Sequence, residues 1–327
     1  MTVRLSAIAR SKGLFHPTQY GSLPGLSSSD ACLALTHEFR TLQRPRLKVS
    51  TLFLDIKAGF DNVDASTLRA KLLASQVPSY MVDWVSSFLS ERTSTLVFQG
   101  SPNIRSPVSV DTPQGTAISP LLFLVYVTPL HMLVLRGLMV FYVEDLLITV
   151  AFPSHRGNIR LLQRHFSTMA TRGPNIGVSF SVPKTELIHW RTPSQRTPPS
   201  TAPIELEGRL FHPSNVVRWL EYWFTPALTT IHHFRHRLFL ARAQAVFFFG
   251  KRLSFPGAGV TPIWCHLIAN GLLLPILTYG ADLLTPNSSA LRGMNSFWHT
   301  VQRWTTNNFY STPTSILSWE ACLPPII

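Results

Sequence analysis

The chain has 327 residues, of which 45% are hydrophobic and 14% are charged. This much apolar surface excludes general disorder, and the length suits one large domain or two. Lys and Arg outnumber Asp and Glu by 29 to 16, for a formal net charge of +13. Because 23 of the basic residues are Arg, whose planar group fits phosphate, nucleic acid is the leading expected partner. A gene rich in G and C would raise the Arg count without any such partner.

The charge is uneven along the chain. Residues 1–150 carry 13 basic and 10 acidic side chains, a net charge of +3, whereas residues 151–327 carry 16 and 6, a net charge of +10. The segment 222–281 contains no carboxylate at all. This asymmetry predicts that the second half binds a polyanion.

Short strand-like runs alternate with helical patterns in the first part of the chain. The run 50–55 is apolar and β-branched and ends on a carboxylate, and 95–98 also reads as a strand. Helical spacing occurs at 68–73 and 81–89, with Pro78 as a break between them. Mixed elements of this kind predict an α+β first part.

Two acidic residues interrupt an apolar segment farther along. The runs 140–143 and 146–150 flank Glu144 and Asp145. This pattern predicts a β-hairpin with the two acids at its turn.

The clearest break in composition is 191–203, where four prolines forbid a helix or a central strand. After this predicted linker, two short runs around Gly208 indicate a hairpin. From Thr229 onward the pattern becomes helical, which predicts a mostly α second part. The apolar face of the first helix is expected to comprise Phe234, Leu238, Ala241, Ala245 and Phe248.

Carboxylates occur at two places where acids are scarce. Asp55 ends an apolar run and Asp61 follows six residues later, while Glu144 and Asp145 lie between apolar runs. Burying carboxylates is costly unless a cation compensates, and Mg²⁺ prefers such oxygen ligands. Either segment alone is better explained as an exposed turn, so only the pair together favours a two-metal site for phosphoryl transfer.

Other chemistry-bearing residues point to no second site. The histidines 232, 233 and 236 face apart on a helix and are expected to be polar surface residues. The three cysteines lie far apart and are expected to be buried thiols in a reducing compartment. The uncharged stretches 112–135 and 253–281 are interrupted by Pro, Gly and His, so stable membrane association is not expected.

Five blocks of sequence then occur in a particular order. They are FLDIKAGFDNV (53–63), TPQGTAISPLLFLVY (112–126), FYVEDLL (141–147), GVSFSVPKTELIHW (177–190) and VRWLEYWF (217–224). In order and spacing they resemble the motifs of reverse transcriptases of the non-LTR (LINE-like) retrotransposon class. Weaker likeness at 16–31, 274–284 and 312–325 extends the resemblance over nearly the whole chain.

The resemblance implies a set of catalytic residues. Asp55, Glu144 and Asp145 match the metal-binding acids and would hold two Mg²⁺ ions, with Mn²⁺ as an alternative. Lys184 matches the lysine near the departing pyrophosphate, although a solvated lysine is an equally good interpretation. Asp61 is expected to be structural.

The resemblance also implies residues that bind substrate. Phe60 matches the aromatic that favours deoxynucleotides, and Gln114 and Gly115 match residues bordering the nascent base pair. An ordinary core Phe and a turn Gly are the structural alternatives. Residues expected to meet template and primer are Arg235, Arg242, Lys251, Arg252 and, in the primer-grip hairpin or simply in its core, Trp219.

The implied architecture is an α+β polymerase right hand followed by helices. Partial fingers and palm would occupy 1–190, the linker 191–203, a primer-grip-like hairpin 204–224, and a mostly α thumb with a trailing C-terminal region 225–327. The implied reaction is RNA-directed DNA synthesis from deoxynucleoside triphosphates on an RNA template and a DNA primer. Without a signal-peptide core at its N-terminus, the chain is expected to be intracellular, nuclear or cytoplasmic.

Four departures from the family pattern lead us to expect impaired activity. Glu144 replaces an Asp, Glu221 stands where a turn Gly is usual, and residues 58–59 read Ala-Gly in place of Gly-Ala. No match to the preceding fingers block is found, which suggests a truncated, degenerate copy. A nucleic-acid-binding remnant without catalysis is the main alternative, and a membrane-associated protein is a weaker one.

Overall fold

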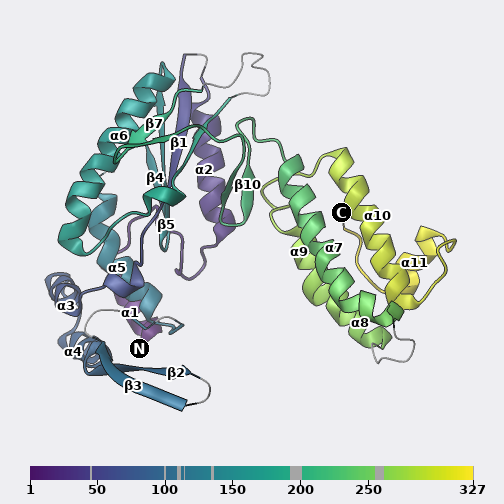
Figure 1. The fold of residues 1–327 in the computed structure, drawn as a ribbon, viewed down its shortest axis with the longest axis horizontal. Coiled ribbons are helices and arrows are strands. Elements are labelled where there is room, and N and C mark those ends of the chain that lie inside the picture. Colours follow the sequence, from purple (N-terminus) through teal and green to yellow (C-terminus); the bar gives the residue numbers. More distant parts are fainter. Residues whose placement is uncertain are drawn as a thin grey trace. The chain divides into compact units, whose positions relative to one another are not determined.

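The computed structural model describes residues 1–44, 46–98, 101–108, 112–113, 115–133, 136–191, 201–254 and 261–326 (Figure 1). Gln114 and most of the predicted linker fall outside these ranges, and the side chains of Lys251 and Arg252 also lie outside the described part. The chain divides into two compact units, Met1–Asn215 and Val216–Ile327.

The first unit is built on a four-stranded antiparallel sheet with strand order β4-β5-β1-β6. The expected α+β class with an antiparallel sheet is therefore confirmed for this unit. The strands are β1 (Lys48–Asp55), β4 (Leu138–Tyr142), β5 (Asp145–Phe152) and β6 (Glu186–His189).

Both faces of this sheet are covered by other elements. Because successive side chains of a strand point to opposite sides, neighbouring residues of β1 pack into different layers. Leu52 and Leu54 of β1 belong to a core shared with the helices α5 and α6. On the other face, the Trp190 indole N–H donates to Thr51 Oγ1 at 2.7 Å, and its ring packs on Phe39 of α2 at 4.9 Å. Double coverage explains why β1 is almost continuously buried. The covering helices are α2 (Ser28–Leu42), α5 (Ser119–His131) and α6 (His155–Arg172) (Figure 1).

The β4–β5 hairpin has a two-residue turn. Tyr142 pairs with Asp145, so the turn is Val143–Glu144 and lies one residue earlier than predicted. Val143 has φ +59°, a conformation that a β-branched residue rarely adopts. The two neighbouring acids therefore occupy different positions: Glu144 is on the turn, and Asp145 is the first residue of a strand.

The remaining predicted elements of the first unit are confirmed. The helical patterns at 68–73 and 81–89 lie within α3 and α4, and the run 95–98 lies within β2. Asp64 caps α3 by accepting a hydrogen bond from the Thr67 amide at 2.7 Å. These elements are α1 (Thr2–Ser11), η1 (Phe60–Asn62), α3 (Ala65–Ala74), α4 (Ser79–Leu89), β2 (Arg92–Phe98), β3 (Ser101–Val108), η2 (Gly173–Ile176) and η3 (Val182–Lys184).

The range 204–224, expected as one primer-grip-like hairpin, contains two hairpins. The pair β7 (Ile204–Leu206) and β8 (Arg209–Phe211) belongs to the first unit, where β7 packs on α6. The pair β9 (Val217–Trp219) and β10 (Tyr222–Phe224) belongs to the second unit. The boundary between the units therefore falls between the two hairpins.

The second unit is mostly helical, as expected. Its longest helix, α7 (Ile231–Ser254), buries Phe234, Ala241 and Ala245. The prediction of Phe248 on this face is wrong, because Phe249 is the buried residue and continues the four-residue steps. The other helices are α8 (Pro262–Ile268), η4 (Ala269–Leu273), α9 (Leu274–Thr278), α10 (Ser288–Thr306) and α11 (Thr314–Glu320).

The expectation that the α7 histidines lie on the surface is wrong for His233, which is fully buried. Its Nε2 lies 2.7 Å from the Tyr279 carbonyl oxygen, and its Nδ1 accepts a hydrogen bond from the Trp223 amide at 3.4 Å. Burial lowers the pKa of His233 to about 4, which keeps the ring neutral. His233 thus connects β10, α7 and the segment after α9.

Two further expectations have structural outcomes. Among the described residues, no helix has the length and apolar character needed to cross a membrane. Cys32 and Cys265 are buried as expected, whereas Cys322 is exposed, so the expectation of three buried thiols is wrong for Cys322.

Candidate active site

The sheet brings the three predicted acids to one end of the first unit. In the register of β1 and β5, Asp55 lies directly opposite Asp145. Glu144 occupies the adjoining turn, and its carbonyl oxygen accepts a hydrogen bond from the Ile56 amide at 3.0 Å. Antiparallel pairing therefore joins two segments that are about 90 residues apart in the sequence.

The electrostatics of these acids reflect their crowding. Burial, followed by the charges of Asp55 and Glu144, raises the pKa of Asp145 to about 6. Burial and the charges of Asp55 and Asp61 also raise the pKa of Glu144. Carboxylates that repel one another in a half-buried site carry excess negative charge, which a cation would relieve.

Lys184 supplies a cation at this site. Its Nζ lies 3.0 Å from Asp55 Oδ2, and this ion pair raises the pKa of Lys184. The amide of Ser181 donates to the Asp55 carbonyl oxygen at 2.8 Å, which fixes the segment that carries the lysine beside β1. Since the Lys184 side chain is 68% exposed, it is accessible to a ligand as well as to Asp55.

Phe60 lies next to Glu144. The Phe60 amide donates to Glu144 Oε1 at 3.3 Å, and the Phe60 ring stacks on Phe123 of α5 with centroids 4.9 Å apart. The Phe60 carbonyl oxygen accepts a hydrogen bond from the Thr112 amide at 2.9 Å. These contacts join the first and second sequence blocks to the acidic turn.

Gly115 adopts φ +85°, a conformation that favours glycine, and a Cβ there would meet no atom of the described residues within 4 Å. The backbone at this position therefore borders open space. Gln114, its predicted companion, lies outside the described residues.

The acids are gathered but are not arranged around one point. Asp55 is paired with Lys184, and Glu144 is bonded to backbone. In the part of the chain that the structure describes, no group of three His, Cys, Asp or Glu residues is arranged to hold a metal ion. The donor set nevertheless fits a hard divalent cation, because it offers carboxylate oxygens whose raised pKa values reflect excess negative charge.

The predicted nucleic-acid-binding residues belong to the second unit. Arg235 and Arg242 are exposed on α7, whereas Trp219 is only 4% exposed and packs inside its hairpin. The β9–β10 turn consists of Leu220 and Glu221, both with positive φ. Glu221, which stands where a turn Gly is usual in the family, has a φ of +65°, in the region that favours glycine.

Sequence reasoning missed Arg237, which is 6% exposed. Its guanidinium donates to the Glu221 carbonyl oxygen at 2.8 Å and lies 4.0 Å from the centroid of the Tyr279 ring. The sequence around Arg237 does not indicate its burial, because its partners, Glu221 and Tyr279, lie on other elements.

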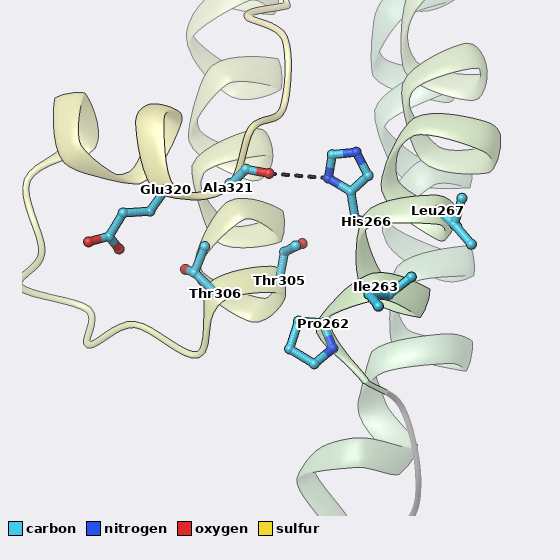
Figure 2. Close-up of a pocket in the computed structure, with 8 residues that line it drawn as sticks. All are labelled: Pro262, Ile263, His266, Leu267, Thr305, Thr306, Glu320 and Ala321. Carbon is cyan, nitrogen blue, oxygen red and sulfur yellow. Dashed lines mark hydrogen bonds between the residues drawn. The ribbon is translucent and has the colours of Figure 1, made fainter.

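The second unit also contains a pocket of about 500 Å³ between α8 and the ends of α10 and α11 (Figure 2). His266 lies at its edge, and its Nδ1 is 3.2 Å from the Ala321 carbonyl oxygen. No residue predicted to be functional lines this pocket. The lining residues are Pro262, Ile263, His266, Leu267, Thr305, Thr306, Glu320 and Ala321.

An antiparallel sheet with acids at the β1 end and at the adjoining hairpin turn is the arrangement that the resemblance implies for the palm of a reverse transcriptase. A family profile described as "Reverse transcriptase (RNA-dependent DNA polymerase)" matches residues 1–234. The chain therefore belongs to the reverse transcriptase family, and the likeness deduced from the five blocks is confirmed.

Curated relatives come from transposons of Drosophila melanogaster. The chain is 22% identical over 290 residues to "Probable RNA-directed DNA polymerase from transposon BS", covering 86% of this chain and 31% of that protein. It is 24% identical over 240 residues to "Probable RNA-directed DNA polymerase from transposon X-element", covering 71% and 26%. The chain thus spans less than a third of the length of these relatives. They support the expected retrotransposon origin.

Among solved structures, the chain is similar to apo telomerase from Candida tropicalis. The TM-score is 0.51 at 12% identity, and the match covers 97% of this chain and 50% of that one. At this identity the likeness concerns the fold alone, and it agrees with a reverse transcriptase fold.

Proposed function

We propose that the chain performs RNA-directed DNA synthesis, extending a DNA primer on an RNA template with deoxynucleoside triphosphates. The observation that carries this proposal is the register that sets Asp55 opposite Asp145, with Glu144 on the adjoining turn, in a member of the reverse transcriptase family. In this proposal the first unit supplies palm and partial fingers. The β9–β10 hairpin is the primer grip, and the helices after it are the thumb.

Reverse transcriptases generally use divalent metal ions. Asp55, Glu144 and Asp145 would hold two Mg²⁺ ions, or Mn²⁺ in their place. When bound, such ions stabilise the charge that develops on a transferring phosphoryl group. Asp55 pairs with Lys184 through Oδ2 and Glu144 accepts from the Phe60 amide through Oε1, so each carboxylate would offer a metal ion its second oxygen.

The remaining site residues act on the nucleotide. Lys184, once separated from Asp55, would place a positive charge or a proton donor near the departing pyrophosphate. Phe60 would exclude the ribose 2′-hydroxyl, and Gln114 with Gly115 would border the nascent base pair. The open space beside Gly115 supports a close approach of substrate to backbone.

The second unit would hold the template–primer duplex. Arg235 and Arg242 are exposed on α7 and would neutralise backbone phosphates together with Lys251 and Arg252. Trp219 would act indirectly, by packing the hairpin that contacts the primer. Contacts of this kind are independent of base sequence and strongly dependent on salt.

Primer extension on an RNA template tests the proposal. The unmodified chain is expected to incorporate deoxynucleotides weakly in Mg²⁺ or Mn²⁺, and Asp55→Asn is expected to abolish incorporation. Asp83→Asn is the matched control, because this acid is 67% exposed and paired with Arg69 on a different helix. Incorporation that survives in Asp55→Asn would contradict the assignment.

A second function is favoured by the ion pair between Lys184 and Asp55, which neutralises one of the proposed ligands. In this alternative the chain binds template–primer without chemistry. Duplex binding with a steep salt dependence, combined with no incorporation in either metal, would support it.

A further inference from the structure

Gly59 stands where glycine is not needed for its backbone. Its φ is −59°, an ordinary helical value. Its neighbour Ala58 has φ +48°, in the region that favours glycine. Backbone conformation alone would favour glycine at position 58 and would accept alanine at position 59. A different constraint must therefore account for Gly59.

That constraint is space beside the acidic turn. A Cβ at position 59 would lie 2.7 Å from Phe123 Cζ and 3.0 Å from Glu144 Oε1. The first distance is shorter than real Cβ contacts, and the second is unusually tight. The Phe123 ring therefore requires glycine at position 59, and the Glu144 carboxylate occupies the space beside the same glycine, where a Cβ would press on it.

Glu144 uses this position to bind backbone. Its carboxylate accepts a hydrogen bond from the Phe60 amide, which opposes the rise in its pKa that burial causes. An aspartate is shorter by one methylene group, roughly 1.5 Å, and would not reach this amide in the same backbone. The bonded amide belongs to the residue whose ring stacks on Phe123, so the hydrogen bond helps to fix the position of the Phe60 ring.

We infer that Gly59 and Glu144 form a coupled pair. Gly59 provides the space for the longer carboxylate, and Glu144 holds the Phe60 amide and so positions the Phe60 ring. Gly59 and Glu144 are in this sense positioning residues for nucleotide selection, a statement that rests on the proposed function. It follows that Glu144→Asp alone does not restore full activity, because the shorter carboxylate loses the Phe60 amide.

Hydrogen–deuterium exchange on the full chain tests the coupling without any assay of activity. The variants are Gly59→Ala, Glu144→Asp and the double variant, followed at the amides of residues 59–60. The acceleration caused by Gly59→Ala is expected to be about tenfold greater with Glu at position 144 than with Asp. The contact with Phe123 exists in both backgrounds and cancels in this comparison.

Equal acceleration in the two backgrounds would overturn the inference. Gly271→Ala is the matched control, since a Cβ there meets no atom within 4 Å and the φ of Gly271 is ordinary. It is expected to leave exchange at residues 59–60 unchanged in either background.

A second measurement concerns the Phe60 ring. In primer extension, the preference for deoxy- over ribonucleotides is expected to fall several-fold in Glu144→Asp and to be kept in Glu144→Gln, whose amide oxygen still accepts from the Phe60 amide. An unchanged preference would overturn the positioning of Phe60. If no variant extends a primer, the proposed function fails, and the exchange measurement still decides whether the two residues are coupled.

Discussion

The two units each contain a tight hairpin turn with glutamate in its second position, and the two glutamates have opposite surroundings. Glu144 ends the Val143–Glu144 turn of β4–β5, and Glu221 ends the Leu220–Glu221 turn of β9–β10. Val143 alone adopts positive φ in the first turn, whereas both residues do so in the second. The turns therefore share their length and the position of the glutamate, but not the backbone conformation of the glutamate.

The charges around the two glutamates differ. Glu144 is half-buried among Asp55 and Asp61, and its carboxylate accepts a hydrogen bond from the Phe60 amide. Glu221 is paired with the arginines Arg218 and Arg237. A turn glutamate is thus surrounded by like charge in one unit and by opposite charge in the other. The elements packed around each turn therefore set the electrostatic surroundings of its glutamate.

The largest expected effect is on catalysis. Asp145→Asn removes one of the proposed metal ligands and is expected to lower primer extension by roughly 10²- to 10³-fold, the usual cost of losing a group that stabilises the transition state. Glu221→Gln is the counterpart in the other hairpin and is expected to change the rate less than about fivefold. Comparable losses in both variants would remove the distinction between the two turns.

The next effect concerns stability of the second unit. Arg237→Ala removes a buried guanidinium that binds the Glu221 carbonyl oxygen and stacks on Tyr279. The free energy of unfolding of this unit is expected to fall by about 2–4 kcal/mol, because a buried acceptor loses its partner and a cavity forms. Arg235→Ala, two residues away on the same helix and exposed, is the control and is expected to cost less than about 0.5 kcal/mol. Urea unfolding followed by exchange at residues 216–254 measures both.

A third effect is a pH dependence confined to the first unit. The pKa of Asp145 rises from 3.8 to about 6 on folding, chiefly through burial. Its contribution to stability is therefore fully present below about pH 4 and is lost as the pH rises through 6, by an amount on the order of 2 kcal/mol. Buried histidines of lowered pKa, such as His155, act in the opposite direction.

The difference between the unmodified chain and Asp145→Asn isolates this carboxylate from the histidines. Urea unfolding of both chains between pH 4 and pH 7 is expected to show the loss only in the unmodified one. Addition of Mg²⁺ is expected to restore stability above pH 6 in the unmodified chain and to have a smaller effect in the variant. An absence of any Mg²⁺ effect would contradict the proposed metal site.

Much of the first unit could be predicted because its signals are local. The apolar run of β1 and the two apolar runs that flank the acidic pair indicated strands, and the pairing of β1 with β5 then brings Asp55 and Asp145 together. The turn itself was predicted one residue late, since Asp145 is charged but pairs as a strand residue. Polarity indicates that a turn is near, and pairing decides where it lies.

The remaining features depend on contacts between distant segments. Lys184 and Asp55 are separated by 129 residues, and Phe60 and Glu144 by 84. The burial of His233 depends on Tyr279, which lies 46 residues away. No periodicity within a single segment encodes such contacts, so the ion pair, the Glu144 position and the buried His233 required the structure.

The smallest expected effects are the most direct comparison of the two turns. Glu144→Gln and Glu221→Gln each remove one charge, and both keep the length of the side chain and the backbone conformation. At pH 8, Glu144→Gln is expected to stabilise the first unit, because it removes repulsion by Asp55 and Asp145 while the amide oxygen still accepts from Phe60. Glu221→Gln is expected to destabilise the second unit, because it removes the ion pair with Arg218.

Each change is expected to be below about 1 kcal/mol, since both glutamates are partly exposed to solvent. Chemical unfolding of the two variants at pH 8 measures the signs, and equal signs would show that the turns do not differ in the way their surroundings indicate.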